Sequence, residues 1–475
     1  MSEYSNKRTH AALESFYRRC CGFLLTVIAT GSFMFVWYRF VQDHNQTGAL
    51  LGMGNLGMAL LIYAGLFIVI TKWLGGFHFG ANRKMQVFAS QVLSLFSLDF
   101  LEIFISMAIT GQFRFGFLFL GIYFLLFLVQ TVVIVLVTNI IIIVHRKIVP
   151  PLQIFEIYGE RANLGNSIRD KFDRVPAKYH VAKMTKCPEN VEELLPDIKK
   201  YDAIALYDLP DEQQSSLIKI GYELGKRVYF LPKLSDIIVQ TSENMNLFDT
   251  PLALNRNEGI SLVRLGIKRF FDIFLSLLAL VILSPVFLIV AIAIKRDDGG
   301  PVFFRQERVT LGGRKFQMIK FRSMIVDAEK DGRSHPAGED DDRITKVGKV
   351  IRAVRIDELP QLINILKGDM SIVGPRPERV EHVEKYTQQI PEFKLREKVR
   401  GGLTGYAQVY GKYNTTALDK VKMDLIYITH YSLLLDLQLI FETVKILFQK
   451  ESTEGFSEER VEEIQDFELE NDDEK

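Results

Sequence analysis

The sequence predicts a membrane protein of α plus α/β class, and three features indicate this fold. Four long apolar runs fill the first 150 residues, strand-like and helix-like stretches alternate after them, and a fifth apolar run opens the C-terminal part. From these features we expect a four-helix transmembrane bundle over 1–150 and a Rossmann-like α/β domain over 151–255. We expect a C-terminal domain over 264–450, with a re-entrant membrane helix over 270–294, and an acidic disordered tail over 451–475.

The composition agrees with a membrane-bound protein of several domains. The chain has 475 residues, of which 48% are hydrophobic, and its net charge is only +1. A length of this order allows roughly two to four domains. The three cysteines, Cys20, Cys21 and Cys187, have neither the spacing of a metal site nor that of a disulfide framework. We expect no nucleic-acid partner.

The first four apolar runs lie near 21–41, 56–74, 87–110 and 115–144. Each is long enough for a membrane span, which needs about 20 residues of helix. Lys and Arg gather before the first run, between the second and third, and after the fourth, while the other two loops hold almost none. Because basic residues accumulate in cytoplasmic loops, we expect the chain after Arg146 to begin in the cytoplasm.

Two acids, Asp99 and Glu102, lie inside the third apolar run and share one face of a helix. Acids within a membrane are costly to bury and are often functional. We expect that this face packs inward or that the segment lies at the membrane interface, and a functional role is the alternative.

The fifth run differs from the others because both of its ends are basic. Lys268 and Arg269 precede it, and Ser284-Pro285 lies in its middle. Proline removes a backbone donor and kinks a helix. We therefore expect a helix that enters one leaflet and turns back, with Ser284 supplying a hydrogen bond at the break and Asp272 held by Lys268 or Arg269. An ordinary kinked span is the alternative.

The middle of the chain contains strand-like stretches at 154–158, 202–207 and 227–231, with a helical stretch over 212–225 between the last two. This alternation predicts a parallel sheet. The glycines after the first stretch form a poor dinucleotide-binding fingerprint. We therefore favour a structural or regulatory role for this domain over nucleotide binding.

The adjacent acids Asp357 and Glu358 are the strongest candidates for catalysis. They lie among arginines, close to a Gly-Pro-Arg-Pro turn, and such a mixture suits chemistry on phosphate. Adjacent carboxylates can share a site only on a turn or at a helix start. We expect Asp357 to cap a helix that begins at Leu359, which would also favour phosphate. The alternative is a simple cap with Glu358 on the surface. The candidate phosphate-binding cations are Lys320, Arg322, Arg352, Arg355 and Arg376.

Several motifs follow one another in a specific order: Gly300-Pro-Val-Phe-Phe-Arg-Gln-Glu-Arg308, Lys320-Phe-Arg-Ser-Met324, Asp357-Glu-Leu-Pro-Gln361, Gly374-Pro-Arg-Pro377 and Gly401-Gly-Leu-Thr-Gly-Tyr-Ala-Gln408. Over about 264–450 the chain closely resembles the bacterial sugar transferases, also called monotopic phosphoglycosyl transferases. The apolar N-terminus and the middle domain look like their long subgroup, the polyprenyl glycosylphosphotransferases.

This resemblance implies the first membrane step of exopolysaccharide, capsule or O-antigen synthesis. A sugar 1-phosphate would pass from a UDP-sugar to polyprenyl (undecaprenyl) phosphate, giving polyprenyl-diphosphate-sugar and UMP. Asp357 would be the nucleophile of a covalent phosphosugar intermediate. Mg²⁺ would be the cofactor, with Asp357 and Glu358 as its ligands. Thr404, Gly405 and Gln408 match a family loop near the nucleotide.

The resemblance also implies a homodimer, contact with the lipid bilayer and with other polysaccharide-assembly proteins, and a catalytic domain on the cytoplasmic face of the bacterial inner membrane. Two other functions remain open at this point. The chain could be a non-catalytic scaffold for polysaccharide assembly, or a membrane phosphatase that uses water as the acceptor. Residues 419–450 predict one helix or a pair of helices, either interfacial or part of the core.

Overall fold

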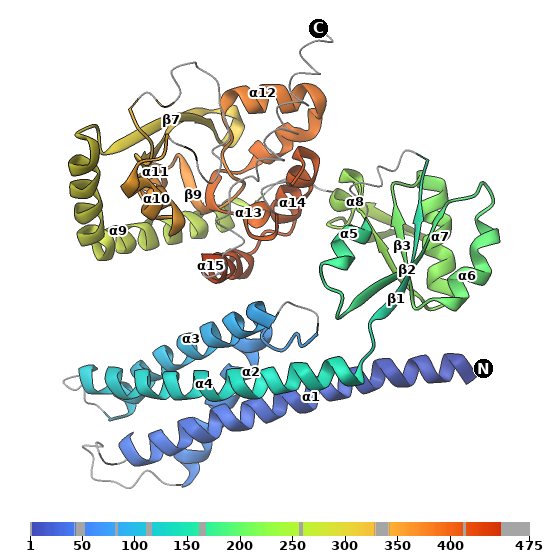
Figure 1. Ribbon diagram of the computed structural model, residues 1–475, viewed down its shortest axis with the longest axis horizontal. Coiled ribbons are helices and arrows are strands. Elements are labelled where there is room, and N and C mark those ends of the chain that lie inside the picture. Colours follow the sequence, from blue (N-terminus) through green and yellow to red (C-terminus); the bar gives the residue numbers. More distant parts are fainter. Residues whose placement is uncertain are drawn as a thin grey trace. The chain divides into compact units, whose positions relative to one another are not determined.

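The structure, a computed structural model, contains both helices and sheets, as the sequence predicts (Figure 1). It divides into two compact units, Met1–Leu231 and Pro232–Lys475. The acidic tail expected over 451–475 lies outside the described residues. The structure describes residues 2–41, 43, 53–80, 84–110, 116–160, 168–255, 260–326, 328, 341, 343–411 and 415–447.

The first unit begins with four long apolar helices, α1 (Ser2–Val36), α2 (Met53–Trp73), α3 (Lys84–Thr110) and α4 (Gly116–Ile148). Each packs against two of the others around a core that includes buried aromatic side chains. Within the described part of the chain, five helices are long and apolar enough to cross a membrane, and these four are among them. Many of their large apolar side chains are exposed, which suits contact with lipid.

A polar network connects all four helices inside this apolar core. The Tyr63 hydroxyl of α2 donates to Asp99 Oδ1 of α3 at 2.9 Å. Gln130 Nε2 of α4 lies 3.1 Å from the Tyr63 hydroxyl and 2.9 Å from Ser32 Oγ of α1. Asp99 and Glu102 are each only 2% exposed, so the predicted inward packing of this helix face is confirmed. Mutual hydrogen bonds reduce the cost of burying polar groups among apolar helices.

A parallel sheet completes the first unit. Its strands are β1 (Leu152–Tyr158), β2 (Tyr179–Lys186), β3 (Ala203–Tyr207) and β4 (Arg227–Phe230), in the order β2-β1-β3-β4. The three predicted strands correspond to β1, β3 and β4. The sequence did not indicate β2, because its several polar residues interrupt the regular alternation of apolar and polar side chains that marks a strand. Helices α5 (Ile168–Asp173), α6 (Leu195–Lys200) and α7 (Asp211–Glu223) accompany the sheet, and Leu217 of α7 joins the core with Phe155 and Ile204.

The second unit begins before the boundary that the sequence suggested. Helix α8 (Leu234–Val239) is followed by a hairpin of β5 (Glu243–Leu247) and β6 (Thr250–Leu254). Ile237 of α8 is 1% exposed and packs in an apolar cluster with Phe393 and Leu425. Residues 232–255, which the sequence predicts to be part of the middle domain, therefore belong structurally with the C-terminal part of the chain.

Helix α9 contains the fifth apolar run as one continuous helix, Leu262–Asp298, with Pro285 inside it. Figure 1 shows that α9 changes direction along its length. Ser284 Oγ donates to the Val281 carbonyl at 2.8 Å, which agrees with the predicted local hydrogen bond. Most of the side chains along α9 are exposed, and only 11% of its most apolar stretch is buried.

Polar side chains fasten both ends of α9 to the second unit. At the first end, Lys268 Nζ lies 2.7 Å from Asp436 Oδ2, and Arg269 donates to the carbonyls of Ile365 and Leu366. At the other end, Asp298 forms an ion pair with Arg322.

One expected contact at the first end of α9 is wrong. Neither Lys268 nor Arg269 holds Asp272, because acceptors on other elements engage both cations. The Asp272 carboxylate instead accepts from Ser371 Oγ at 3.1 Å and from the Ile372 N–H at 3.0 Å. Asp272 therefore links α9 to the strand that contains Ser371 and Ile372.

Two small sheets and several helices form the rest of this unit. Strands β7 (Phe303–Val309) and β8 (Lys315–Phe321) form an antiparallel hairpin, and β9 (Met370–Val373) pairs in parallel with β10 (Gly401–Thr404). Of the two forms that the sequence allows for 419–450, one helix or a pair, the structure contains the pair. The helices of this part are α10 (Lys346–Ala353), α11 (Gln361–Lys367), α12 (Val380–Gln389), α13 (Tyr406–Tyr410), α14 (Ala417–Thr429) and α15 (Leu433–Leu447).

The packing of α8 predicts where a stable C-terminal fragment begins. A fragment that starts at residue 232 should unfold at a higher temperature than one that starts at 256, because the shorter fragment loses Ile237 from its core. Loss of a buried side chain of this size costs about 2–5 kcal/mol. Thermal unfolding of both fragments in the same detergent measures the difference. Equal midpoints would mean that α8 is dispensable for this unit.

Candidate active site

The adjacent acids Asp357 and Glu358 lie in a single 3₁₀ turn, Ile356–Glu358, between α10 and α11. Arg355, just before the turn, has a φ of 58° and so changes the direction of the chain as α10 ends. The predicted placement of both acids on a turn is confirmed. The predicted cap is wrong, because α11 begins only at Gln361, after Pro360, and Asp357 accepts no capping hydrogen bond. Proline, which lacks an N–H, fits this helix start.

Glu358 is the centre of the site. Its Oε1 accepts hydrogen bonds from Lys320 Nζ and from Arg376 Nη2, both at 2.9 Å. Burial alone would raise the pKa of Glu358, but Arg376 and Lys320 lower this pKa well below its usual value. Glu358 is therefore a carboxylate at neutral pH. Since Lys320 lies near the end of β8 and Arg376 lies after β9, one carboxylate joins three segments of the chain.

Asp357 is in a different state although it is the next residue. It is partly buried, and among the described residues it takes part in no hydrogen bond through its carboxylate. Burial raises the pKa of Asp357, and the negative charge of Glu358 raises it further, while Lys320, Arg352 and Arg355 oppose both effects. Asp357 thus presents an uncommitted carboxylate among cations.

The cations predicted around the dyad divide into two groups. Lys320 and Arg376 touch Glu358, and Arg352 and Arg355 lie close enough to lower the pKa of Asp357. Burial lowers the pKa of Lys320, although Glu358 opposes that effect. Four of the five predicted cations therefore act electrostatically on the dyad.

Arg322 is the exception. It directly follows β8, is 6% exposed, and pairs with Asp298 at the end of α9. Lys320 and Arg322 are two residues apart, and this spacing predicts one shared face if both lie in a strand. In the structure they have different acidic partners, because β8 ends at Phe321 and the chain then passes α9. Arg322 thus links α9 to the end of β8.

Thr404, Gly405 and Gln408 lie where β10 leads into α13, beside Gly374. The Gly374 N–H donates to the Thr404 carbonyl at 2.9 Å, and a Cβ at Gly405 would clash with the Gly374 carbonyl. Thr404 Oγ1 lies 2.6 Å from Thr443 Oγ1, and Gln408 Nε2 donates to the Leu403 carbonyl. These residues therefore support the Gly-Pro-Arg-Pro loop, and their contact with a nucleotide stays a prediction.

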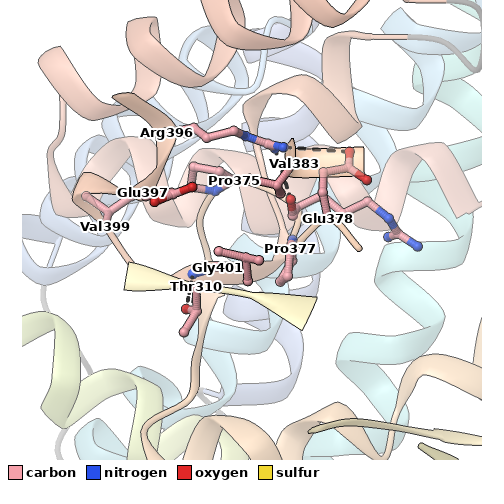
Figure 2. Close-up of a pocket in the computed structure, with 11 residues that line it drawn as sticks. Thr310, Pro375, Pro377, Glu378, Val383, Arg396, Glu397, Val399 and Gly401 are labelled. Atoms are coloured by element: carbon pink, nitrogen blue, oxygen red, sulfur yellow. Dashed lines mark hydrogen bonds and ion pairs between the residues drawn. The ribbon is translucent and has the colours of Figure 1, made fainter. Parts of the chain in front are cut away.

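A small cavity lies beside this loop, and Figure 2 shows the side chains around it. Arg376, Glu378 and Arg396 line it together with Thr310 and Gly401. Sequence reasoning gave no role to Arg396, whose contacts come from distant parts of the chain and form no local motif. Glu378 directly follows the Gly-Pro-Arg-Pro motif, and this position in the sequence is the signal that could have marked it as part of the site.

The donor set of the dyad fits a weakly held Mg²⁺. This ion uses one or two carboxylates and completes its octahedron with phosphate oxygens and water. Asp357 has free oxygens for this purpose, whereas both cations occupy Oε1 of Glu358. Among the residues that the structure describes, no group of three or more His, Cys, Asp or Glu could hold a metal. Such a site would therefore need the phosphates of a substrate to complete it.

Comparison with known proteins identifies relatives of this part of the chain. Residues 263–450 match the family model of the bacterial sugar transferases. A UDP-glucose:undecaprenyl-phosphate glucose-1-phosphate transferase from Caulobacter vibrioides is 42% identical over 186 residues, which are 38% of this chain and 69% of that protein.

Two longer relatives match over the same part. A protein from Klebsiella pneumoniae with the same name as the Caulobacter relative is 45% identical over 203 residues, 42% of this chain and 42% of the relative. A UDP-N-acetylgalactosamine-undecaprenyl-phosphate N-acetylgalactosaminephosphotransferase from Aeromonas hydrophila is 45% identical over 184 residues, 38% of this chain and 43% of the relative. The matched segment therefore covers less than half of each of these two proteins.

The two acids should respond differently to loss of charge. Glu358→Gln should destabilise the second unit by about 2–3 kcal/mol, because Lys320 and Arg376 lose their carboxylate and Lys320 is largely buried. Asp357→Asn removes the same charge at the next residue, where no hydrogen bond depends on it, and should change stability by less than about 0.5 kcal/mol. Denaturant unfolding of both variants compares them. Equal destabilisation would contradict the central position of Glu358.

Proposed function

This chain belongs to the bacterial sugar transferase family, and we propose that it transfers a sugar 1-phosphate from a UDP-sugar to undecaprenyl phosphate, with release of UMP. The observation that carries the proposal is the turn in which Asp357 stays uncommitted while Glu358 binds Lys320 and Arg376. The names of the relatives support a nucleotide-sugar donor and a lipid phosphate acceptor. Those names include both glucose and N-acetylgalactosamine, so the proposal leaves the sugar open.

The proposed reaction has two displacements at one phosphorus atom. An oxygen of the Asp357 carboxylate attacks the phosphorus that bears the sugar, the bond from this phosphorus to the oxygen of UMP breaks, and UMP leaves. An oxygen of the lipid phosphate then attacks the same phosphorus, and the bond to Asp357 breaks, which restores the carboxylate. Division of one difficult step into two is the purpose of covalent catalysis.

The surrounding cations supply what phosphoryl transfer requires, which is mainly position and charge neutralisation. Glu358 holds Lys320 and Arg376 at the site, and both cations would face the negative charge of the diphosphate. Arg352 and Arg355 would favour the ionised, nucleophilic form of Asp357, because they lower its pKa. Asp357 and Glu358 would also hold Mg²⁺, which would supply further neutralisation of the phosphates when bound.

The apolar helices support a location in the bacterial inner membrane. In this proposal α1–α4 cross the bilayer, and α9 enters one leaflet from the cytoplasmic side and returns. The ion pairs at both ends of α9 favour this arrangement, because they hold both ends to the second unit. The exposed apolar side chains of α9 also favour it, because an apolar surface of this kind is unfavourable in water. The active site would then lie at the level of the lipid phosphates.

The direct test is to incubate the purified protein with Mg²⁺, undecaprenyl phosphate and a panel of UDP-sugars, and to measure UMP. The proposal expects UMP from at least one sugar, with a requirement for the lipid. Free sugar phosphate formed without lipid would instead support the phosphatase alternative. Absence of any product from the folded protein would support the scaffold alternative.

Asp357→Asn should lower the rate of UMP release by about 10³-fold or more, because the amide cannot act as the nucleophile. Asp249→Asn, at an exposed position of the β5–β6 hairpin, is the matched control and should keep full activity. The assay compares initial rates at equal amounts of folded protein. An Asp357→Asn variant within tenfold of the parent would exclude this residue as the nucleophile.

The proposed membrane geometry predicts an effect of Pro285→Ala. Without proline the interior of α9 regains a backbone hydrogen bond, and a straighter helix becomes favourable by about 3 kcal/mol. Cysteines placed after residue 300 should then become accessible to a labelling reagent on the opposite side of the membrane. Labelling that stays on one side in both proteins would show that Pro285 does not determine the turn.

A further inference from the structure

The Pro375–Glu378 segment is fastened through every one of its carbonyl groups. Two backbone donors hold its ends: the Gly402 N–H donates to the Pro375 carbonyl at 2.8 Å, and the Val309 N–H donates to the Glu378 carbonyl at 3.0 Å. Pro375 and Pro377 have fixed φ angles and no N–H of their own. The segment is therefore stiff, and its attachment depends on the groups that its carbonyls accept from.

Two arginine side chains hold the carbonyls in between. Arg396 Nη2 donates to the Arg376 carbonyl at 2.9 Å, and Arg308 Nη1 donates to the Pro377 carbonyl at 3.3 Å. Both arginines also face the Glu378 carboxylate, with nitrogen–oxygen distances of 3.7 Å for Arg396 and 3.9 Å for Arg308. Figure 2 shows Arg396 beside Glu378. We call this arrangement of Arg308, Arg396 and Glu378 the arginine clamp.

A buried acid fixes the direction of Arg396. Asp424 of α14 accepts from Arg396 Nε at 3.0 Å and lies 2.8 Å from Nη2, and the two side chains are only 1% and 6% exposed. A buried ion pair adds little to stability compared with apolar side chains of the same volume. Stability therefore does not account for this pair. The geometry of the pair does account for it, because Asp424 holds the guanidinium of Arg396 in an orientation in which Nη2 donates to the Arg376 carbonyl.

The clamp holds the main chain of Arg376, and the side chain of Arg376 reaches the dyad. Arg396 donates to the Arg376 carbonyl, while Nη2 of Arg376 donates to Glu358 at 2.9 Å. We propose that Arg396 and Arg308 are positioning residues, which keep Arg376 directed at the dyad while the substrate phosphate binds and reacts. This inference rests on the proposed function. Donors that are already in place need no reorganisation during the reaction, and this is the main source of electrostatic catalysis.

The kinetic test is a double-mutant cycle between the clamp and the residue that it positions. Arg396→Gln should lower kcat of UMP release on the order of 10- to 100-fold, because small misplacements of a catalytic group have effects of this size. In the background of Arg376→Gln, which already lacks the positioned guanidinium, the same substitution should change kcat less than about threefold. Arg396→Lys should recover part of the loss, since lysine can still donate one hydrogen bond.

A purely structural role for Arg396 gives another pattern. The substitution would then lower kcat by equal factors in both backgrounds, which would overturn the proposal. Arg314→Gln is the control, because this exposed arginine pairs with Asp369 and donates to the Gly368 carbonyl, and neither partner belongs to the clamp. If Arg396→Gln does not fold, Arg308→Gln tests the same prediction through the Pro377 carbonyl, and Asp424→Asn tests it through the acid behind Arg396.

Hydrogen exchange tests the clamp without any measurement of activity. In full-length Arg396→Gln, peptides that contain Arg376 and Gly402 should exchange at least about tenfold faster than in the parent protein, while peptides from α15 stay unchanged. Unchanged exchange in the loop would overturn the clamp even if the enzyme is active. Conversely, a parent protein without transferase activity but with this local effect would refute the proposed function and leave the clamp intact.

Discussion

The structure of the candidate active site depends on one shared carboxylate. Glu358 accepts from Lys320 and Arg376, which come from β8 and from the loop after β9, so a single side chain brings together three segments that the chain order separates. Either cation alone would leave a buried charge imperfectly compensated, and such an imbalance is costly. The three segments therefore form the site together. The same pairing leaves Asp357 as the acid whose oxygens remain available.

The attachment of α9 follows the same principle of charge satisfied by distant partners. Lys268, Asp272 and Asp298 each find an acceptor or donor on another element of the second unit. The polar ends of this helix are thus committed to protein, while its apolar middle is exposed. A helix held in this way can present an apolar surface to lipid without losing its connection to the site. The proposed membrane geometry of α9 would therefore be physically coupled to the second unit.

Local patterns predicted much of this arrangement, and several of the exceptions have a common cause. The spacing of apolar residues gave the strands β1, β3 and β4, and the adjacency of two acids required a turn. Three of the wrong expectations concern partners: Asp272 binds β9, Arg322 binds Asp298, and α8 packs within the second unit. The expected cap at Asp357 fails for a local reason, because α11 begins only at Gln361. A sequence shows which side chains need a partner. The tertiary fold decides which of several equally suitable partners lies within reach.

The contrast between the two adjacent acids argues for a division of roles in the proposed reaction. Both are the same chemical group, yet cations lower the pKa of Glu358 strongly, while burial beside Glu358 raises that of Asp357. Environments that separate two titratable groups in this way are typical of sites where each group has its own task. Glu358 would lose Lys320 and Arg376 if it formed a bond to phosphorus. Asp357 breaks no hydrogen bond by doing so, and the surrounding cations gain a partner when the diphosphate arrives.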